Sequence, residues 1–439
     1  MSSILVCCAP AQGHMAPLLA IASHLASEGH DVRFLGGRTY EARIRAAGLE
    51  FLALPPEADL DLDLDHVNEA FPERAALTGM KEIQWSMTNL FVRPAAAQVR
   101  AIDAALAVRP ADVVLTDTGT FGAFIYCARP RDERLPLALV HIGPLQSRDD
   151  DTAPFGLGMH PMRGTVGRLR NRALNAIVDR TMYRPIMTAF REVFAEAGVP
   201  MPRGMRFGDL PNSLDRVVQL SVPGFEYERP SLPDTVRFIG PVTSRVPSAV
   251  ALPEWWSDLD GDRPIVHVSQ GTVANSDLGQ LVRPTMEALA DEDVLLVVAT
   301  GGRPVAELGP LPANVRAAEY LPYDRLFPRL AAFVTNAGYG GLHYALAHGV
   351  PIVAAGRTED KVETTARVAW SGAGINLRTQ RPSPKTVRRA VDRVLADPSY
   401  RRASTRIGAE ILVAPGAAGV ETVIAELIGQ QAAIKEHRS

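Results

Sequence analysis

Two series of alternating apolar strands and amphipathic helices run along this chain, and no other feature restricts its fold as much. The first series begins with strands at residues 4–9 and 31–35 and helices at 17–28 and 40–47, and the second begins with a strand at 264–269. Strands that alternate with helices in this way form parallel sheets with helices on both faces. We therefore expect an α/β fold with two doubly wound sheets.

The length of the chain agrees with two large domains. A chain of 439 residues is too long for one ordinary core, and a hydrophobic content of 46 % is enough for two. Residues 241–253 contain three prolines together with serine and valine, a composition typical of a linker. We predict a first domain at 1–240, a linker at 241–253, a second domain at 254–415, and a C-terminal helix and tail at 416–439 that can pack back on the first domain.

Charge and apolar patterning argue against two classes of protein. A formal net charge of −3 leaves no basic surplus for binding nucleic acid. No run of about eighteen apolar residues occurs, so we expect no membrane-spanning helix, and the amino terminus enters a strand without the pattern of a signal peptide. Cys7, Cys8 and Cys127 lie in apolar segments without C-x-x-C spacing, as reduced core cysteines do. We expect a cytoplasmic protein that is a monomer or a homodimer.

A glycine-rich turn in the second series is the strongest candidate for a ligand site. An apolar strand at 330–334 runs into a turn that contains Gly338, Gly340 and Gly341, and a helical pattern follows at 342–348. Glycines let the backbone approach a ligand closely, and the first turn of a helix offers unpaired N–H groups and a positive dipole end. An anion is expected there, although ordinary α/β proteins also contain such turns.

The segments around this turn give it a wider context. Residues 315–323 precede it, and residues 349–356, Asp360, Lys361 and residues 371–374 follow. This order across roughly sixty residues resembles the donor-sugar signature of the UDP-glycosyltransferase superfamily, which includes bacterial macrolide and flavonoid glycosyltransferases. The resemblance implies a GT-B fold, in which two Rossmann-like domains face a central cleft. It also implies a UDP- or dTDP-sugar as co-substrate, with no other cofactor and no metal.

The same resemblance assigns the donor-binding residues. Tyr320 is expected to stack on the base, and Leu321 to offer its backbone to the base edge. The diphosphate is expected at the glycine turn and at Gly271 and Thr272, which follow the strand at 264–269. Asp360 and Lys361 are expected to face the sugar hydroxyls.

Three positions depart from the family pattern. Asn336, Tyr344 and Lys361 stand where most relatives carry His, Glu and Gln. Asn336 still offers a hydrogen-bond donor to phosphate but no charge. Tyr344 offers one hydroxyl to the ribose, with His343 as an alternative, so UDP and dTDP both stay open.

His14 and Asp117 are the candidates for the chemistry. His14 follows the first strand on a turn, where an imidazole can accept a proton near neutral pH. Asp117 ends another strand of the first series, and the carboxyl ends of parallel strands share one edge of a sheet. The resemblance implies roles for both residues. In the family, a histidine at the position of His14 is the general base, and a carboxylate from the region of Asp117 pairs with it. A purely local role for Asp117, capping its own turn, is the alternative.

An apolar pocket for the acceptor is expected in the first domain. Its candidate residues are aromatic or methionine side chains: Trp85, Phe91, Phe121, Phe155 and Met159. The same residues at helical spacing also suit a core.

The sequence therefore predicts an inverting glycosyltransferase that moves a hexose to a hydroxyl of a hydrophobic small molecule such as a polyketide, macrolide or phenol. Two alternatives are a nucleotide-sugar 2-epimerase of the same fold and a non-catalytic nucleotide-sugar-binding auxiliary protein. The apolar first half argues against the epimerase, and the retained His14 and Asp117 argue against the auxiliary protein.

Overall fold

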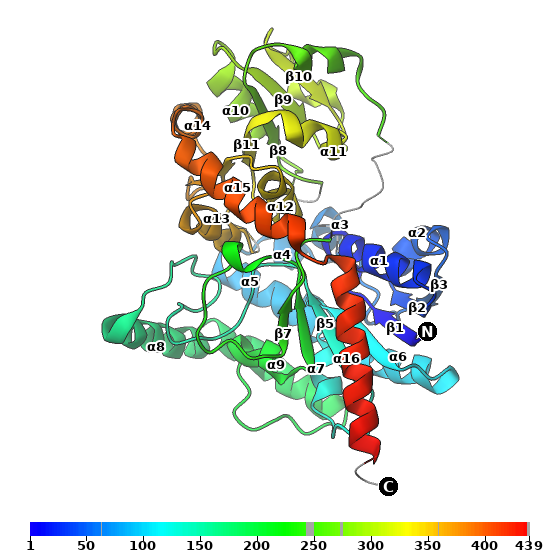
Figure 1. The fold of residues 1–439 in the computed structure, drawn as a ribbon. Helices are drawn as coiled ribbons and strands as arrows, with labels where there is room; N and C mark the ends of the chain where they lie inside the picture. The colour runs from blue at the N-terminus through cyan, green and yellow to red at the C-terminus, as the bar shows by residue number, and fades with distance from the viewer. Residues whose placement is uncertain (63, 243–249, 273–274, 359, 437–439) are drawn as a thin grey trace.

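Two parallel sheets, one in each half of the chain, form the framework of the protein (Figure 1). The computed structural model describes residues 1–62, 64–242, 250–272, 275–358 and 360–436, so most of the predicted linker lies outside the described residues. Both sheets carry helices on their two faces, as the alternation of apolar strands and helices predicted. The expected doubly wound architecture is confirmed.

The first sheet has seven strands in the order β3-β2-β1-β4-β5-β6-β7. All neighbours are parallel, with Cys7 of β1 opposite Thr116 of β4. Because β2 and β3 extend to one side of β1 while β4 to β7 extend to the other, the strand order reverses between β1 and β4. The strands are β1 (Ser3–Cys7), β2 (Asp31–Gly36), β3 (Glu50–Ala53), β4 (Val113–Asp117), β5 (Leu137–His141), β6 (Arg216–Gln219) and β7 (Val236–Phe238).

The second sheet has six parallel strands in the order β10-β9-β8-β11-β12-β13. Its order reverses between β8 and β11, where Ser269 pairs with Thr335. Ligands of open α/β sheets bind beyond the carboxyl ends of the strands at such a reversal. The strands are β8 (Ile265–Ser269), β9 (Leu295–Ala299), β10 (Val315–Ala318), β11 (Leu330–Thr335), β12 (Ile352–Ala354) and β13 (Gly374–Asn376).

Four apolar clusters join helices to the faces of the sheets. On the first sheet α1 (Gln12–Ser27), α2 (Glu41–Ala46) and α16 (Ala417–Glu436) share one cluster. The opposite face holds α6 (Ala95–Val108), α7 (Gly122–Cys127) and α9 (Tyr183–Glu196). On the second sheet α10 (Val282–Leu289) and α14 (Pro384–Ala396) cover one face, and α11 (Tyr323–Leu326), α12 (Tyr339–Ala347), α13 (Lys361–Trp370) and α15 (Pro398–Val413) contribute to the other.

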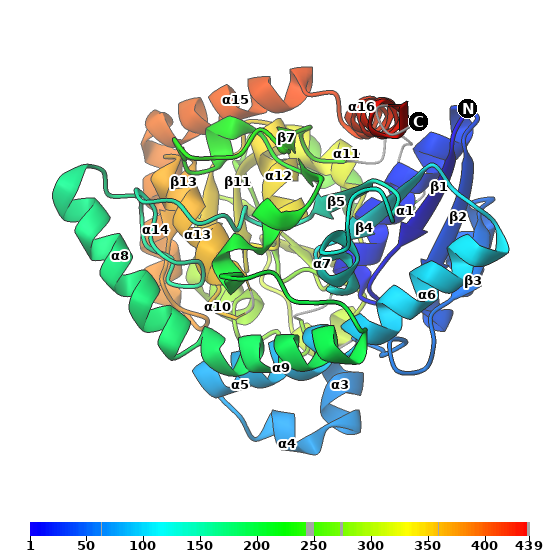
Figure 2. The same ribbon diagram turned by 90° about the horizontal axis from the view of Figure 1, so that it is seen from below.

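Shorter helices lie next to α9, at the lower edge of the view in Figure 2. They are α3 (Leu64–Ala70), α4 (Pro72–Ala75), α5 (Met80–Ser86) and the π-helical segment η2 (Met87–Val92). Both α5 and η2 contact α9, and α8 (Gly164–Arg180) runs into α9. The insert between β3 and α6 therefore packs on α9.

The last helix, α16, returns to the first half of the molecule. The backbone N–H of Gly416 donates to the carbonyl of Ile239 at 2.7 Å, and Val420, Ile424 and Leu427 are buried in the core of the first sheet. Within the described residues, no single helix is long and apolar enough to span a membrane. In the part of the chain that the structure describes, one pair of helices, α15–α16, bent by 51°, passes that test of length and composition.

One expected helix begins earlier than predicted. Helix α1 begins at Gln12, not at Pro17, because the N–H groups of His14 and Met15 already donate to the carbonyl of Ala11. Further along the chain, α8 and α9 are two separate helices, since Pro185 has no N–H to continue the hydrogen bonds of α8.

Candidate active site

His14 and Asp117 meet where the strand order of the first sheet reverses. His14 lies in the first turn of α1, just after β1, and Asp117 is the last residue of β4. The Nδ1 atom of His14 is in direct hydrogen-bond contact with Oδ2 of Asp117. The two side chains predicted as a catalytic pair are thus brought together, 103 residues apart in sequence.

Asp117 is fully buried and held from several sides. Its carboxylate accepts hydrogen bonds from the N–H of Ala9 at 2.9 Å, from the N–H of Gly119 at 2.7 Å and from the hydroxyl of Thr120. Burial by itself raises the pKa of a carboxyl group, but here the charge of His14 and the hydrogen bonds from His14, Thr120 and Ala9 outweigh it and lower the pKa of Asp117. The carboxylate is therefore ionised.

An ionised Asp117 determines which nitrogen of His14 carries the proton. A carboxylate only accepts hydrogen bonds, so Nδ1 of His14 is the donor in this contact. In a neutral ring Nε2 is then unprotonated and can accept a proton. The structure shows no hydrogen-bond partner of Nε2 among the residues that it describes, and the His14 side chain is 20 % exposed.

Gly119 allows this close arrangement. A Cβ atom at Gly119 would lie 2.7 Å from Cβ of Ala9, 2.9 Å from Oδ2 of Asp117 and 3.0 Å from Cε1 of His14. Any side chain there would displace the pair. The turn after β4 is thus shaped around the two side chains, which argues against a purely local capping role for Asp117.

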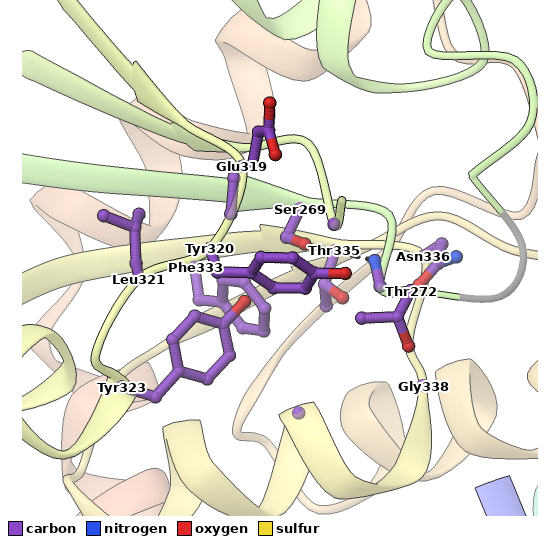
Figure 3. Close-up of a pocket in the computed structure, with 14 residues that line it drawn as sticks. Ser269, Thr272, Glu319, Tyr320, Leu321, Tyr323, Phe333, Thr335, Asn336 and Gly338 are labelled. Atoms are coloured by element: carbon purple, nitrogen blue, oxygen red, sulfur yellow. Dashed lines mark hydrogen bonds between the residues drawn. The ribbon is translucent and has the colours of Figure 1, made fainter. Parts of the chain in front are cut away.

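The carboxyl edge of the second sheet holds a cavity, again where the strand order reverses (Figure 3). Of the residues predicted to bind the donor, seven line it: Gly271, Thr272, Tyr320, Leu321, Asn336, Gly338 and Gly341. Figure 3 shows Leu321 toward one end of the cavity and Thr272, Asn336 and Gly338 toward the other, with the ring of Tyr320 between them. This spacing suits a ligand with an aromatic group at one end and an anionic group at the other.

The end of the cavity that is predicted to receive the diphosphate is the start of α12. Gly338 is the N-cap, and no side chain caps the helix. A Cβ atom at Gly338 would have no protein atom within 4 Å, so the space in front of this backbone is open. Ala337 before it has a φ of 66°, a conformation that costs about 1 kcal/mol or more in a residue other than glycine. Thr364 of α13 supports the turn by donating to the carbonyl of Ala337 at 2.9 Å.

Asn336 joins the two turns of the cavity by a hydrogen bond. Its side chain is buried, and Nδ2 donates to the backbone carbonyl of Gln270, the residue before Gly271. One of its two N–H groups is therefore engaged within the protein. The predicted phosphate contact is left to the remaining N–H and to the backbone of α12.

Five residues predicted to contact the donor lie outside the lining of the cavity: Gly340, His343, Tyr344, Asp360 and Lys361. His343 faces the first half instead, where its Nε2 accepts from the hydroxyl of Ser221 at 2.9 Å, and burial lowers its pKa to about 4. Tyr344 packs on the rings of Tyr323 and Phe327, with 5.8 Å between ring centroids. His343 and Tyr344 therefore lie on faces of α12 that pack against other parts of the protein.

Asp360 and Lys361 lie at the start of α13. Oδ2 of Asp360 is 3.2 Å from the position that a Cβ atom would take at Gly143, which follows β5. Lys361 is 4 % exposed, and its Nζ lies 3.4 Å from the hydroxyl of Thr358. Asp360 thus lies at the carboxyl edge of the first sheet, and the sugar contacts of both residues stay predictions.

Sequence reasoning missed half of the lining of the cavity. The additional residues are Ser269, Ala299, Gly301, Glu319, Tyr323, Phe333 and Thr335. Ser269, Ala299 and Thr335 are the last residues of β8, β9 and β11, so the carboxyl ends of the predicted strands were the available signal. Gly301 is required by close packing, since a Cβ atom there would lie 2.0 Å from the carbonyl oxygen of Gly271.

The residues predicted for an acceptor pocket do not form one group. Phe91 lies near His14, with 6.3 Å between ring centroids, and Phe121 is 6.3 Å from Phe91 but buried in the core. Trp85 packs against Phe71 at 5.2 Å. Phe155 and Met159 lie on a loop that contacts α13, because the backbone N–H groups of Gly156 and Gly158 donate to Glu363 of that helix. Their acceptor roles stay predictions.

Two further predictions concern metal ligands and the cysteines. Within the described ranges, no three His, Cys, Asp or Glu side chains gather as a metal site requires, and a metal-independent reaction stays a prediction. The cysteines Cys7, Cys8 and Cys127 are buried and free.

Two doubly wound parallel sheets, each with a polar site where its strand order reverses, have the architecture of a GT-B fold, and comparisons with known proteins agree. Residues 283–427 match the family model for the C-terminal domain of erythromycin biosynthesis protein CIII-like proteins. The chain is 40 % identical to 4'-demethylrebeccamycin synthase of Lentzea aerocolonigenes, covering 92 % of this chain and 94 % of that protein. It is 35 % identical to UDP-glycosyltransferase 2 of Phaeomoniella chlamydospora, covering 93 % and 91 %.

Solved structures share the fold at lower identity. The calicheamicin glycosyltransferase CalG4 superimposes with a TM-score of 0.73 at 22 % identity, covering 98 % of both chains. The glycosyltransferase VinC, solved with dTDP, gives 0.66 at 20 % identity, covering 98 % of this chain and 100 % of the other. The chain therefore belongs to the family 1 natural-product glycosyltransferases of the UDP-glycosyltransferase superfamily, and it is a hexosyltransferase.

Proposed function

We propose that the protein is an inverting, metal-independent glycosyltransferase that moves a hexose from a UDP- or dTDP-sugar to a hydroxyl of a hydrophobic small molecule. The observation that carries this proposal is the His14–Asp117 pair at the strand-order reversal of the first sheet. The reaction joins two substrates, and the two carboxyl edges offer one site for each.

In the proposed reaction Nε2 of His14 takes the proton of the acceptor hydroxyl as its oxygen attacks the anomeric carbon. The bond from that carbon to the diphosphate breaks on the opposite side, and its electron pair leaves with the nucleoside diphosphate, so the configuration inverts. Asp117 stabilises the imidazolium that forms. The N-terminus of α12 stabilises the negative charge that grows on the leaving group without having to reorganise.

The choice between UDP and dTDP rests on the relatives and on the cavity. Several curated relatives are named as UDP-glycosyltransferases or UDP-glucosyltransferases, while VinC and the spinosyn rhamnosyltransferase SpnG were solved with thymidine diphosphate. The Tyr320 ring, 52 % exposed at the mouth of the cavity, can stack on either base. Both donors are therefore tested.

The names of relatives also suggest the class of acceptor. The 4'-demethylrebeccamycin synthase and the calicheamicin glycosyltransferase CalG4 carry the names of natural products. Phe91 beside His14 gives the first half an apolar contact for such a molecule. We propose a polyketide, macrolide or phenolic acceptor.

The test measures release of nucleoside diphosphate from UDP-glucose and dTDP-glucose with a panel of phenolic and macrolide alcohols. We expect acceptor-dependent release that falls by about 10²- to 10⁴-fold in kcat in His14→Ala. His24→Ala, on the same helix, is the matched control and should keep activity. Donor turnover without an acceptor would instead favour an epimerase, and donor binding without turnover with any alcohol would favour an auxiliary protein.

A further inference from the structure

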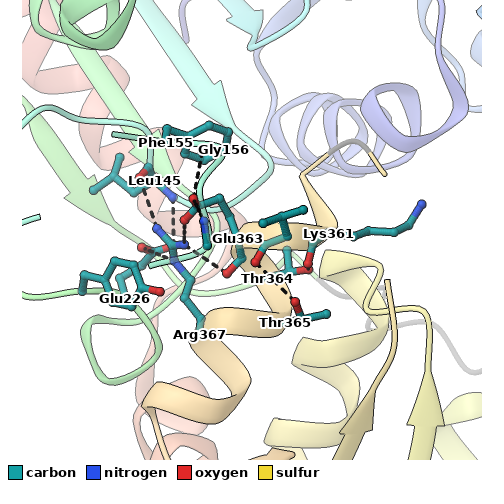
Figure 4. Close-up of polar contacts among 12 residues, drawn as sticks. Leu145, Phe155, Gly156, Glu226, Lys361, Glu363, Thr364, Thr365 and Arg367 are labelled. Carbon is teal, nitrogen blue, oxygen red and sulfur yellow. Dashed lines mark hydrogen bonds and ion pairs between the residues drawn. The ribbon is translucent and has the colours of Figure 1, made fainter. Parts of the chain in front are cut away.

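A buried group of charged residues connects the two halves of the molecule (Figure 4). Arg367 of α13 is fully buried, and Glu226 and Glu363 are 1 % and 4 % exposed. Nε of Arg367 donates to Oε2 of Glu226 at 2.8 Å, and Nη1 donates to Oε2 of Glu363 at 2.8 Å. Glu226 lies between β6 and β7 of the first sheet, so the guanidinium bridges a carboxylate from each half.

Each carboxylate uses its second oxygen for another contact between the halves. Oε1 of Glu226 accepts from the hydroxyl of Tyr339, the first residue of α12, at 3.1 Å. Oε1 of Glu363 accepts from the backbone N–H groups of Gly156 and Gly158, at 2.8 and 2.9 Å. One continuous network thus runs from the glycine turn of the donor cavity to a loop of the first half.

That loop, residues 155–159, carries two of the predicted acceptor residues, Phe155 and Met159. It approaches α13 so closely that a Cβ atom at Gly158 would lie 2.6 Å from Cγ1 and 2.8 Å from the carbonyl oxygen of Val362. Gly158 also has a φ of 60°, which favours glycine. The loop is therefore shaped to lie on the donor half, where Glu363 binds two of its backbone N–H groups.

We propose that Glu363 is a positioning residue that holds the 155–159 loop against α13 and thereby sets the place of the acceptor relative to the donor sugar. This inference rests on the proposed glycosyl transfer. Glu363 acts through the loop and does not touch the substrates. Charge is essential to the role, because a single carboxylate accepts from two backbone N–H groups and from a guanidinium at the same time.

The variant Glu363→Gln tests this requirement with little change in shape. A glutamine side chain has one accepting oxygen, so its NH₂ group must face either the loop N–H groups or Arg367, donor against donor. We expect amide hydrogen exchange in a peptide covering residues 153–160 to become faster by about tenfold or more. We expect KM for the acceptor to rise about tenfold while kcat and the Kd for UDP or dTDP change less than about threefold.

Ser221→Ala is the matched control. The hydroxyl of Ser221 donates to Nε2 of His343, so this variant also removes a buried hydrogen bond between the halves, but away from the loop. It should leave the exchange of the loop and the acceptor KM unchanged. An equal rise of KM in Ser221→Ala would mean that any loosening of the interface has this effect, and the proposal would be wrong.

Gly158→Ala approaches the same contact from the loop side and leaves the buried charges intact. Its Cβ atom would push the loop away from Val362, so it should reproduce the faster exchange and the higher acceptor KM. This variant decides the matter if Glu363→Gln does not fold. The double variant should be no worse than the more affected single one, because both release one contact. Unchanged exchange of the loop in both single variants would overturn the proposal.

The exchange measurement and nucleotide binding need no turnover. If the wild-type protein transfers sugar to none of the alcohols, the proposed function fails, but the exchange data still decide whether Glu363 holds the loop. If transfer occurs and the acceptor KM of Glu363→Gln equals that of the wild type, the positioning role fails alone.

Discussion

The carboxyl edges of the two sheets use different chemistry at the same place in the fold. The first sheet places a titratable pair, His14 and Asp117, at the reversal of its strand order. The second places mostly neutral groups there: backbone at Gly271 and Gly338, hydroxyls of Ser269 and Thr335, and one exposed ring. One edge depends on two side chains, and the other on the course of the backbone.

This difference follows from what each edge has to do in the proposed reaction. Moving a proton requires a side chain with a suitable pKa, and two groups suffice. Holding a diphosphate requires several fixed N–H donors, which the turn before α12 supplies without side chains. Single substitutions should therefore affect rate most strongly at the first edge and affinity at the second.

The largest effect is expected at Asp117. In Asp117→Asn the side-chain amide can donate a hydrogen bond to Nδ1 of His14. The ring proton then lies on Nε2, so Nε2 can no longer accept a proton from the acceptor. We expect kcat to fall by about 10²- to 10⁴-fold, with the Kd for the nucleotide unchanged, in steady-state kinetics and calorimetry. Asp112→Asn, an exposed residue just before β4, is the control. Loss of nucleotide affinity in Asp117→Asn would remove the contrast between the edges.

At the second edge the main effect should come from filling open space. Gly338 has a φ of −59°, so alanine fits its backbone, and its Cβ atom would occupy only the cavity. We expect Gly338→Ala to raise the Kd for UDP or dTDP about tenfold or more and to leave the free energy of unfolding within about 0.5 kcal/mol.

Gly429→Ala in α16 is the matched control, because a Cβ atom there also meets no protein atom within 4 Å. It should bind nucleotide as the wild type does. Normal nucleotide affinity in Gly338→Ala would mean that the diphosphate lies elsewhere.

Tyr320 should have a smaller effect on affinity. Stacking of a base on an aromatic ring contributes about 1–3 kcal/mol, so Tyr320→Ala should raise the Kd for UDP about tenfold. Tyr320→Phe keeps the ring and should bind nearly as tightly, although its hydroxyl lies close to Gly302. Equal losses in the two variants would assign the contact to the hydroxyl rather than to the ring.

The smallest effect concerns stability in acid. Burial lowers the pKa of His343 to about 4, so the unfolded chain binds the extra proton between about pH 6.5 and 4. The stability that the neutral, buried His343 contributes is fully present above about pH 6.5 and is lost as the pH falls toward 4. His343→Gln should reduce the loss at pH 5 by on the order of 1 kcal/mol, measured as the urea midpoint against pH. An unchanged pH dependence would mean that His343 is accessible to protons in the folded state.

Much of this site could be predicted because it lies at strand ends. His14 and Asp117 follow apolar runs that could only be buried strands, and Gly271 and Gly338 follow two others. The carboxyl ends of parallel strands lie at one edge of a sheet, so residues that directly follow the strands in sequence are close together in the structure. His343 and Tyr344 lie outside the lining of the cavity, because a resemblance gives positions but not the direction in which a helical residue points.

The sequence by itself determined the α/β alternation, the two halves and the family, since these depend on local periodicity and on motifs within short stretches. Only the tertiary structure decided which residues line the cavity and that Glu226, Glu363 and Arg367 meet between the halves. Arg367 and Glu226 are 141 residues apart, and no local pattern of charge marks them as partners. This buried ion pair depends on how the two sheets pack together, and that packing is a property of the whole chain.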